Sequence, residues 1–180
     1  MIYLITGASH MGKTLLAQKL LEKTKYPYIS IDHLKMGLIR SGNTDLSPED
    51  DDDLLTSYLW PIVREIIKTA IENKQNLIVE GCYVPFKWRY DFDRYYLQFI
   101  KFICLAMSEE YIEYHFEDII KHESAIETRL KHDLCSKDEL KKDNLKYLFG
   151  FKNAGENVVV INDNYIETIG RIIKGEEYNV

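Results

Sequence analysis

A run of residues near the start of the chain has the composition and spacing of a loop that binds phosphate. Its members are Gly7, Ala8, Ser9, His10, Met11, Gly12, Lys13 and Thr14, in the pattern G-x-x-x-x-G-K-[ST]. The glycines permit backbone angles that other residues avoid, and they let amide groups approach phosphate oxygens. The run therefore predicts a nucleotide-binding P-loop.

The last two residues of this loop have side chains with separate tasks. Lys13 is expected to reach the β- and γ-phosphates as a catalytic residue, and the Thr14 hydroxyl is expected to bind Mg²⁺. An apolar strand pattern, Ile2 to Thr6, precedes the loop, and a helical pattern over residues 13 to 24 follows it. A helix that begins there directs its positive end at the anion. ATP and Mg²⁺ are therefore the expected ligands.

Acidic side chains follow two further predicted strands. Asp32 comes directly after the strand predicted over Tyr26–Ile31, and Glu80 ends the one predicted over Asn76–Glu80. Asp32 is a candidate base for a substrate hydroxyl, or a helix cap, which needs the same residue type. Glu80 is a candidate Mg²⁺ ligand, or a solvated acid at a strand end. Gly81 beside it would let a substrate group approach the backbone.

Two arginines are candidates for binding anionic groups. Arg40 lies beyond Asp32, near the end of a predicted helix, and is either a substrate-binding residue or a surface arginine. Arg129 lies in a polar stretch, residues 122 to 137, that is predicted to form a lid. An arginine of a lid can stabilise the charge of a transferred phosphoryl group. The alternative for Arg129 is a solvated surface position.

Strands alternate with helices along the whole chain. Further strands are predicted over Phe99–Ala106 and Val158–Ile161, which gives an α/β fold with a five-stranded, mainly parallel sheet. Right-handed crossovers place helices on both faces, as in a three-layer α/β/α sandwich. Residues 1 to 180 are expected to form one domain, with a substrate-binding helical region at about 32 to 74.

Three helix boundaries carry local signals. Ser47, followed by Pro48, predicts the start of a long helix, which Pro61 should kink or split. Ser108 precedes acids that favour a helix N-terminus, and Ser136 has capping-box spacing to Glu139. Residues 164 to 174 are predicted to form the final helix.

The composition limits the partners of this chain. A net charge of −6 argues against nucleic acid as a main partner. No apolar run is long enough to span a bilayer, so no membrane association is expected. The three cysteines are widely spaced and form no disulfide or zinc pattern, which favours a reducing, cytoplasmic location.

Three sequence segments resemble the adenylate-kinase-like P-loop small-molecule kinases: GASHMGKT, YISIDHLK and LIVEGCY. The resemblance implies a parallel sheet in the order 2-3-1-4-5, a substrate-binding helical region after strand two and a lid before the last strand. It also implies that Lys13 and Thr14 contact phosphate and metal, that Asp32 faces the substrate, and that Glu80 lies near the metal. Adenylate kinases usually have an arginine shortly after the third-strand acid. Here Cys82-Tyr83-Val84-Pro85 follows instead, which argues against a nucleoside monophosphate as acceptor.

The main functional hypothesis is an ATP-dependent phosphotransferase that moves the γ-phosphoryl group to a hydroxyl or phosphate of a small molecule. One alternative is a nucleotide-dependent switch or ATPase without a small-molecule acceptor. A GTPase version of that alternative is disfavoured because the chain has no N-K-x-D guanine signature. A second alternative is a toxin-like sugar-nucleotide kinase, which would use the same catalytic residues.

Overall fold

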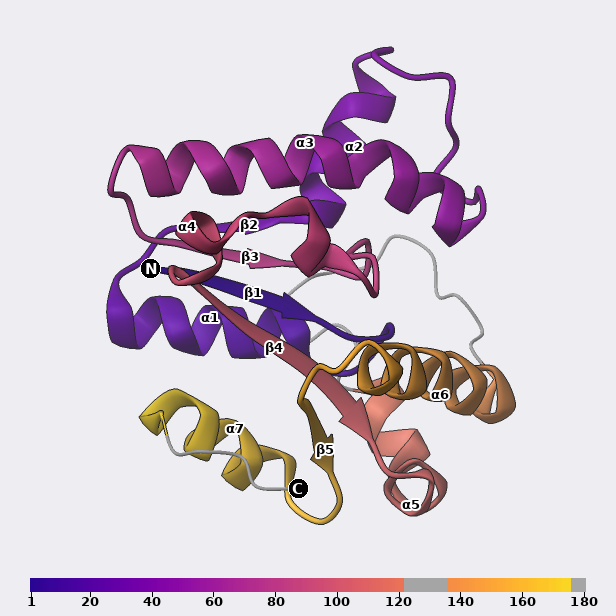
Figure 1. Cartoon of the computed structure of the whole chain (residues 1–180). Coiled ribbons are helices and arrows are strands. Elements are labelled where there is room, and N and C mark those ends of the chain that lie inside the picture. Colours follow the sequence, from indigo (N-terminus) through magenta and orange to yellow (C-terminus); the bar gives the residue numbers. More distant parts are fainter. Residues whose placement is uncertain (122–135, 176–180) are drawn as a thin grey trace.

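The computed structural model describes residues 1 to 121 and 136 to 175 and contains a five-stranded sheet (Figure 1). Every pair of neighbouring strands is parallel, and their order is β2-β3-β1-β4-β5, which confirms the predicted topology. The strands are β1 Ile2–Thr6, β2 Tyr28–Ser30, β3 Leu77–Glu80, β4 Ile100–Met107 and β5 Val158–Ile161.

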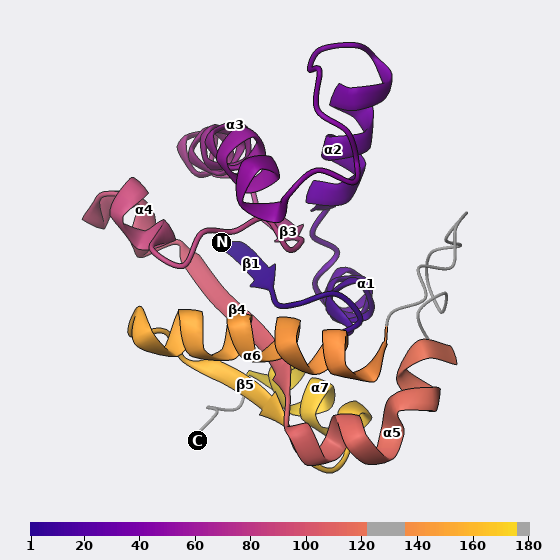
Figure 2. The ribbon, with the colours of Figure 1, turned by 90° about the vertical axis from the view of Figure 1, so that its right-hand side faces the viewer.

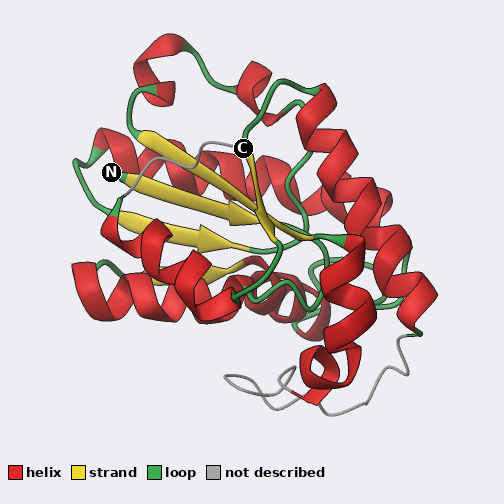
Figure 3. Ribbon diagram, turned by 90° about the horizontal axis from the view of Figure 1, so that it is seen from below, coloured by secondary structure: helices red, strands yellow, loops and turns green. Residues whose placement is uncertain are grey.

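Helices lie on both faces of the sheet, as predicted for a three-layer sandwich. Figure 2 shows α1 on one side of the strands and α3 on the other, and α7 packs beside α1. The strands run between these helices in a common direction (Figure 3). The helices are α1 Lys13–Thr24, α2 Ile31–Arg40, α3 Asp52–Glu72, α4 Arg94–Leu97, α5 Glu109–Lys121, α6 Lys137–Asn153 and α7 Tyr165–Lys174, with a short 3₁₀ turn, η1, at Trp88–Asp91.

The strands at the centre of the sheet are apolar almost throughout because both of their faces are covered. All four residues of β3 are buried, and so are four of the five in β1. The one charged residue among them is Glu80, which is 1% exposed at the carboxyl end of β3. A buried carboxylate is costly without compensating interactions, so its presence marks this end of the sheet as a candidate site.

The strand register brings three strand ends together. Glu80 lies opposite Ile5 of β1 on one side and opposite Ser30 of β2 on the other. The loop after β1, the start of α2 and the residues after β3 therefore meet at one edge. In open α/β sheets, ligands bind at such carboxyl edges.

The long helix of the chain begins later than predicted. It starts at Asp52, and the Asp51 side chain caps it by accepting hydrogen bonds from the amides of Asp53 and Leu54. Ser47 instead begins a turn, in which its amide donates to the Asp50 carboxylate at 2.8 Å. Several acids in this run can cap a helix, and Asp51 does so here, while Asp50 accepts the hydrogen bond from the Ser47 amide.

Pro61 does not split this helix, contrary to that part of the prediction. A single helix runs from Asp52 to Glu72 with Pro61 inside it. Proline removes one backbone hydrogen bond and usually disfavours such a position. A buried apolar stripe spans both sides of Pro61, and its burial offsets the loss. The stripe includes Leu55, Leu59, Val63 and Ile67.

The second strand is shorter than predicted, and this changes the local role of Asp32. The strand ends at Ser30, and Ile31 already belongs to α2. Asp32 therefore lies in the first turn of α2, where the helix dipole favours an acid, and does not cap the helix. Strands β3 and β4 also begin one residue later than predicted, at Leu77 and Ile100.

Other boundaries agree with the sequence signals. The capping box between Ser136 and Glu139 is present at the start of α6, and α5 begins at Glu109 with acids in its first turn. The predicted final helix is α7, which begins at Tyr165. Within residues 1 to 121 and 136 to 175, no helix combines the length and apolar character needed to cross a membrane.

Candidate active site

The loop between β1 and α1 has a conformation that requires glycine at two positions. Gly7 has a φ of 144°, and a Cβ atom there would lie 2.3 Å from the carbonyl oxygen of Leu105. Gly12 has a φ of 78°, and a Cβ atom there would lie 2.0 Å from the Tyr165 hydroxyl. Strand β4 thus packs against the first glycine of the motif, and helix α7 packs against the second. The fixed backbone and the N-terminus of α1 together suit an anion.

Lys13 is buried at the first position of α1. Its side-chain amine donates a 2.8 Å hydrogen bond to the carbonyl oxygen of Ala8, within the P-loop itself. Burial acts to lower the pKa of Lys13, but the neighbouring Cys82, Glu80 and Asp32 offset this, and the net pKa is raised. Lys13 therefore stays positively charged at neutral pH.

The same interactions show which predicted site residues the structure brings together. Asp32 and Glu80 come from different strand ends, yet both lie close enough to Lys13 for their charges to raise its pKa. Thr14 follows Lys13 and is half-buried. One cation and two carboxylates thus gather beside the phosphate-binding loop, at the carboxyl edge of the sheet.

Gly81 has a packing role that brings α2 into this cluster. A Cβ atom on Gly81 would lie 2.7 Å from the Cβ atom of Ile31, the first residue of α2. The absence of a side chain therefore lets α2 start directly against the end of β3. The backbone approach that the sequence indicated is here made by the protein itself, and a substrate contact at Gly81 stays a prediction.

Two residues of the cluster, Lys35 and Tyr83, have no role that a sequence motif predicts. Lys35 lies one turn beyond Asp32 on α2, and its amine contacts the Asp32 carboxylate at 3.0 Å. The same amine donates a 2.7 Å hydrogen bond to the Tyr83 hydroxyl. The i, i+3 spacing of Asp32 and Lys35 was a usable signal for this pair. No local signal joined Lys35 to Tyr83, which is 48 residues away.

Tyr165 is a further site residue that the sequence did not reveal. Its hydroxyl donates a 3.0 Å hydrogen bond to the carbonyl oxygen of Gly12. Burial raises the pKa of Tyr165, which keeps the hydroxyl protonated as a donor. Helix α7 thereby holds the last turn of the P-loop from 153 residues further along the chain.

The structure does not show the other predicted site residues, Arg40, His10 and Arg129, as members of this cluster. Arg40 is exposed at the carboxyl end of α2, on the opposite end of that helix from Asp32. His10 has a φ of 66° within the loop, and its contact with a nucleotide stays a prediction. Arg129 and most of the predicted lid, residues 122 to 137, lie outside the described residues.

A divalent metal ion would have few protein ligands here. The described residues contain no group of three or more His, Cys, Asp or Glu side chains arranged to hold a metal. Mg²⁺ suits such a setting because it is usually held by one or two protein oxygens together with phosphates and water. The buried carboxylate of Glu80 and the hydroxyl of Thr14 have the chemistry for that role.

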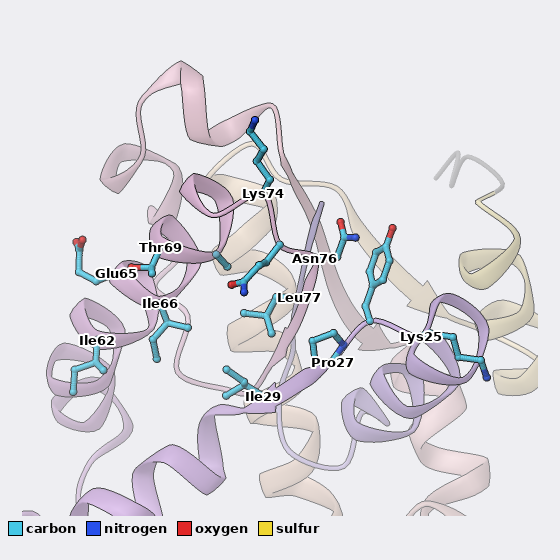
Figure 4. Close-up of a pocket in the computed structure, with 13 residues that line it drawn as sticks. Lys25, Pro27, Ile29, Ile62, Glu65, Ile66, Thr69, Lys74, Asn76 and Leu77 are labelled. Carbon is cyan, nitrogen blue, oxygen red and sulfur yellow. The ribbon is translucent and has the colours of Figure 1, made fainter.

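A separate groove lies at the amino ends of β2 and β3, away from the P-loop. It has a volume of about 780 Å³ and is bounded by the end of α1, the edge strand β2 and α3. Figure 4 shows Ile29, Ile66 and Leu77 pointing toward one another at its centre, while Lys74 extends away. Its apolar centre contrasts with the charged cluster at the other end of the sheet.

The fold is similar to that of solved P-loop kinases that act on small molecules. A solved shikimate kinase from Bacteroides thetaiotaomicron is similar at 16% identity and a TM-score of 0.55, with 97% of each chain covered. A gluconokinase from Sinorhizobium meliloti is similar at 14% identity and a TM-score of 0.50, with 96% of this chain and 93% of that chain covered.

A deoxyadenosine kinase from M. mycoides extends the same likeness. It is 16% identical with a TM-score of 0.53, and the match covers 97% of this chain and 98% of that chain. No family model matches the sequence, and no curated protein matches it. At such identities the comparisons establish the fold, which agrees with the resemblance seen in the sequence.

Proposed function

We propose that this protein is an ATP-dependent phosphotransferase that transfers the γ-phosphoryl group to a hydroxyl group of a small molecule. The observation that carries the proposal is the gathering of Lys13, Asp32 and Glu80 at the edge of the sheet where the P-loop lies. The names of the structural neighbours, which include a gluconokinase and a shikimate kinase, support a small-molecule acceptor.

The chemistry follows from the placement of two charged side chains. Asp32 is partly exposed, with 43% of its side chain accessible, so an acceptor can reach its carboxylate. It accepts the proton of the acceptor hydroxyl as the new oxygen–phosphorus bond forms and the bond to the leaving ADP breaks. Lys13 offsets the negative charge of the phosphates during this transfer.

The proposal assigns the remaining ligands to named residues. The P-loop backbone, from Gly7 to Gly12, holds the nucleotide phosphates, and Thr14 and Glu80 hold Mg²⁺. When bound, the metal ion neutralises charge on the phosphates. A buried carboxylate beside Lys13 suits a site that also contains a divalent cation.

A switch protein has no need of the acceptor-facing residues. A nucleotide-dependent switch requires the P-loop but no carboxylate positioned for an acceptor hydroxyl. The pairing of Asp32 with Lys35 at 3.0 Å, next to Lys13, favours the kinase over the switch. A toxin-like sugar-nucleotide kinase would use the same residues, and the choice of acceptor in the assay separates it.

The test combines an acceptor panel with an Asp32→Asn variant. Asparagine keeps the shape of the side chain but cannot take the proton. We expect acceptor-stimulated ADP formation to fall by about 10²-fold or more, the usual scale of a general base. Stabilisation by MgATP in thermal unfolding should remain near that of the parent, because the P-loop is unchanged.

The matched control is Asp138→Asn. Asp138 is also the second residue of its helix, α6, and it has a lysine three residues later, at Lys141. The control reproduces the loss of the charge–dipole interaction without touching the cluster. Turnover that is equal in both variants would overturn the role of Asp32. ADP formation that no acceptor stimulates would support the switch.

A further inference from the structure

The hydrogen bonds around Lys35 leave one donor of the site without an acceptor among the residues that the structure describes. Lys35 is only 11% exposed and bonds to the Asp32 carboxylate at 3.0 Å and to the Tyr83 hydroxyl at 2.7 Å. Its amine also lies 4.9 Å from the centre of the Tyr83 ring. Lysine has only donors, so the Tyr83 oxygen acts as acceptor in this pair and its own proton is available for another bond.

Tyr83 is placed to use that proton for a ligand. The residue is 6% exposed, and none of the described residues accepts a hydrogen bond from its hydroxyl. Burial raises the pKa of Tyr83 to about 12, so the hydroxyl is protonated at neutral pH. A buried donor without an acceptor is unfavourable, and a substrate oxygen would satisfy it.

The shared amine also limits the distance between the two groups that would hold the ligand. The Asp32 and Tyr83 oxygens both bond to the nitrogen of Lys35, so their separation cannot exceed the sum of 3.0 Å and 2.7 Å. Two hydroxyl groups on neighbouring carbons can bridge such a span, one donating to the carboxylate and the other accepting from the phenol.

The charge balance disfavours an anion at this position. Lys35 is already paired with Asp32, and Lys13 faces the P-loop carbonyl of Ala8. Lys35 is the cation that contacts both Asp32 and Tyr83. A carboxylate or phosphate placed between Asp32 and Tyr83 would meet a like charge, whereas an uncharged diol would complete the hydrogen bonds.

We propose that Tyr83 binds the phosphoryl acceptor, and that the acceptor presents two adjacent hydroxyl groups to Asp32 and Tyr83. Asp32 accepts from the attacking hydroxyl, and Tyr83 donates to its neighbour. Lys35 is a positioning residue that orients both protein groups. This inference rests on the proposed kinase function and adds the substrate class and a second acceptor-binding residue.

The test uses pairs of compounds that differ in one hydroxyl. D-ribose, D-glucose, D-gluconate and shikimate are each assayed beside an analogue that lacks one of two adjacent hydroxyls. The compounds 2′-deoxyadenosine and its 5′-monophosphate serve as acceptors without adjacent hydroxyls. We expect kcat/KM to fall at least tenfold between the best diol and its deoxy analogue, the scale of one lost hydrogen bond in a site built for it.

The decisive variant is Tyr83→Phe, which keeps the ring against Lys35 and removes the hydroxyl. We expect it to raise the KM of the diol about tenfold, with a smaller change in kcat, and to reduce the preference for the diol over its deoxy analogue to about one. Tyr96→Phe is the matched control, because the Tyr96 hydroxyl also bonds a charged side chain, Glu72, at 2.6 Å, but far from the cluster.

Substitutions of Lys35 provide a second, independent test. Lys35→Met should lose the same diol preference, and Lys35→Arg should restore part of it, because arginine also donates to both oxygens. Stabilisation by MgATP should be unchanged in all these variants, which shows that they are folded and bind nucleotide. A purely structural role of Lys35 would lower thermal stability and leave the diol preference intact.

The possible failures are distinguishable. Tyr83→Phe with a full diol preference overturns the assignment of Tyr83. A parent protein that phosphorylates only 2′-deoxyadenosine or its monophosphate overturns the diol assignment and leaves the kinase function in place. A parent that binds MgATP but responds to none of the compounds contradicts both proposals.

Discussion

The two ends of the sheet are formed by the same strands but by different kinds of side chain. At the carboxyl end, Lys13 and Glu80 are buried, at 7% and 1% exposure. At the amino end, apolar side chains line a groove of about 780 Å³, and its charged residues, Lys25, Glu65 and Lys74, are exposed. Burial of charge costs stability, whereas burial of apolar surface supplies it.

This difference predicts that the carboxyl end of the sheet serves the candidate site, whereas the apolar groove at the amino end contributes to stability. Charged groups buried beside a phosphate-binding loop are costly unless a ligand uses them, which is why such groups mark functional sites. The amino-end groove joins the edge strand β2 to α3 through apolar contacts and shows no comparable gathering of buried charge. Substitutions at the carboxyl end should therefore lower phosphoryl transfer, whereas substitutions at the amino end should lower the free energy of unfolding.

The largest expected effect is that of Lys13→Ala at the carboxyl end. Loss of a preorganised cation at the transferred group should lower phosphoryl transfer by about 10²- to 10³-fold. Stabilisation by MgATP in thermal unfolding should be strongly reduced as well. Lys19→Ala, which changes a half-buried lysine of the same helix, is the control and should retain both properties. An active Lys13→Ala variant would contradict the assignment of the P-loop.

An intermediate effect, on stability and not on turnover, is expected from Ile66→Ala in the groove. Ile66 is partly buried against the core, so truncation should cost about 1–2 kcal/mol of unfolding free energy, less than for a fully buried isoleucine. The melting temperature should fall by a few degrees. Turnover of folded protein should not change, and a parallel loss of kcat would show that the two ends of the sheet are coupled.

The smallest effect should come from Tyr165→Phe, which removes one hydrogen bond to the P-loop. The lost bond to the Gly12 carbonyl is worth about 1 kcal/mol, which corresponds to roughly fivefold weaker nucleotide binding. The KM of the acceptor should stay constant because Tyr165 contacts the loop and not the cluster around Asp32. The measurement is the dissociation constant of MgATP by calorimetry. Equal affinity in the two proteins would reduce Tyr165 to a packing residue.

Much of the fold could be predicted from local patterns. The P-loop motif, its flanking strand and helix, and the alternation of elements indicated a parallel α/β sheet, and the family resemblance supplied the order of its strands. Local capping signals located α6, because Ser136 and Glu139 exchange their bonds within one turn. Where several residues offered the same signal, as for Ser47 and Asp51, the sequence selected the wrong start of α3.

The residues of the candidate site also fall into those that local patterns indicate and those that they do not. The sequence by itself determined Lys13, Thr14, Asp32 and Glu80 as candidates, because each follows from a motif or a strand end. Only the tertiary structure decided that Lys35 bonds Tyr83 and that Tyr165 bonds Gly12, across 48 and 153 residues. Such contacts depend on which strand ends and helices meet at the carboxyl edge of the sheet. A local sequence pattern does not specify contacts between residues so far apart in the chain.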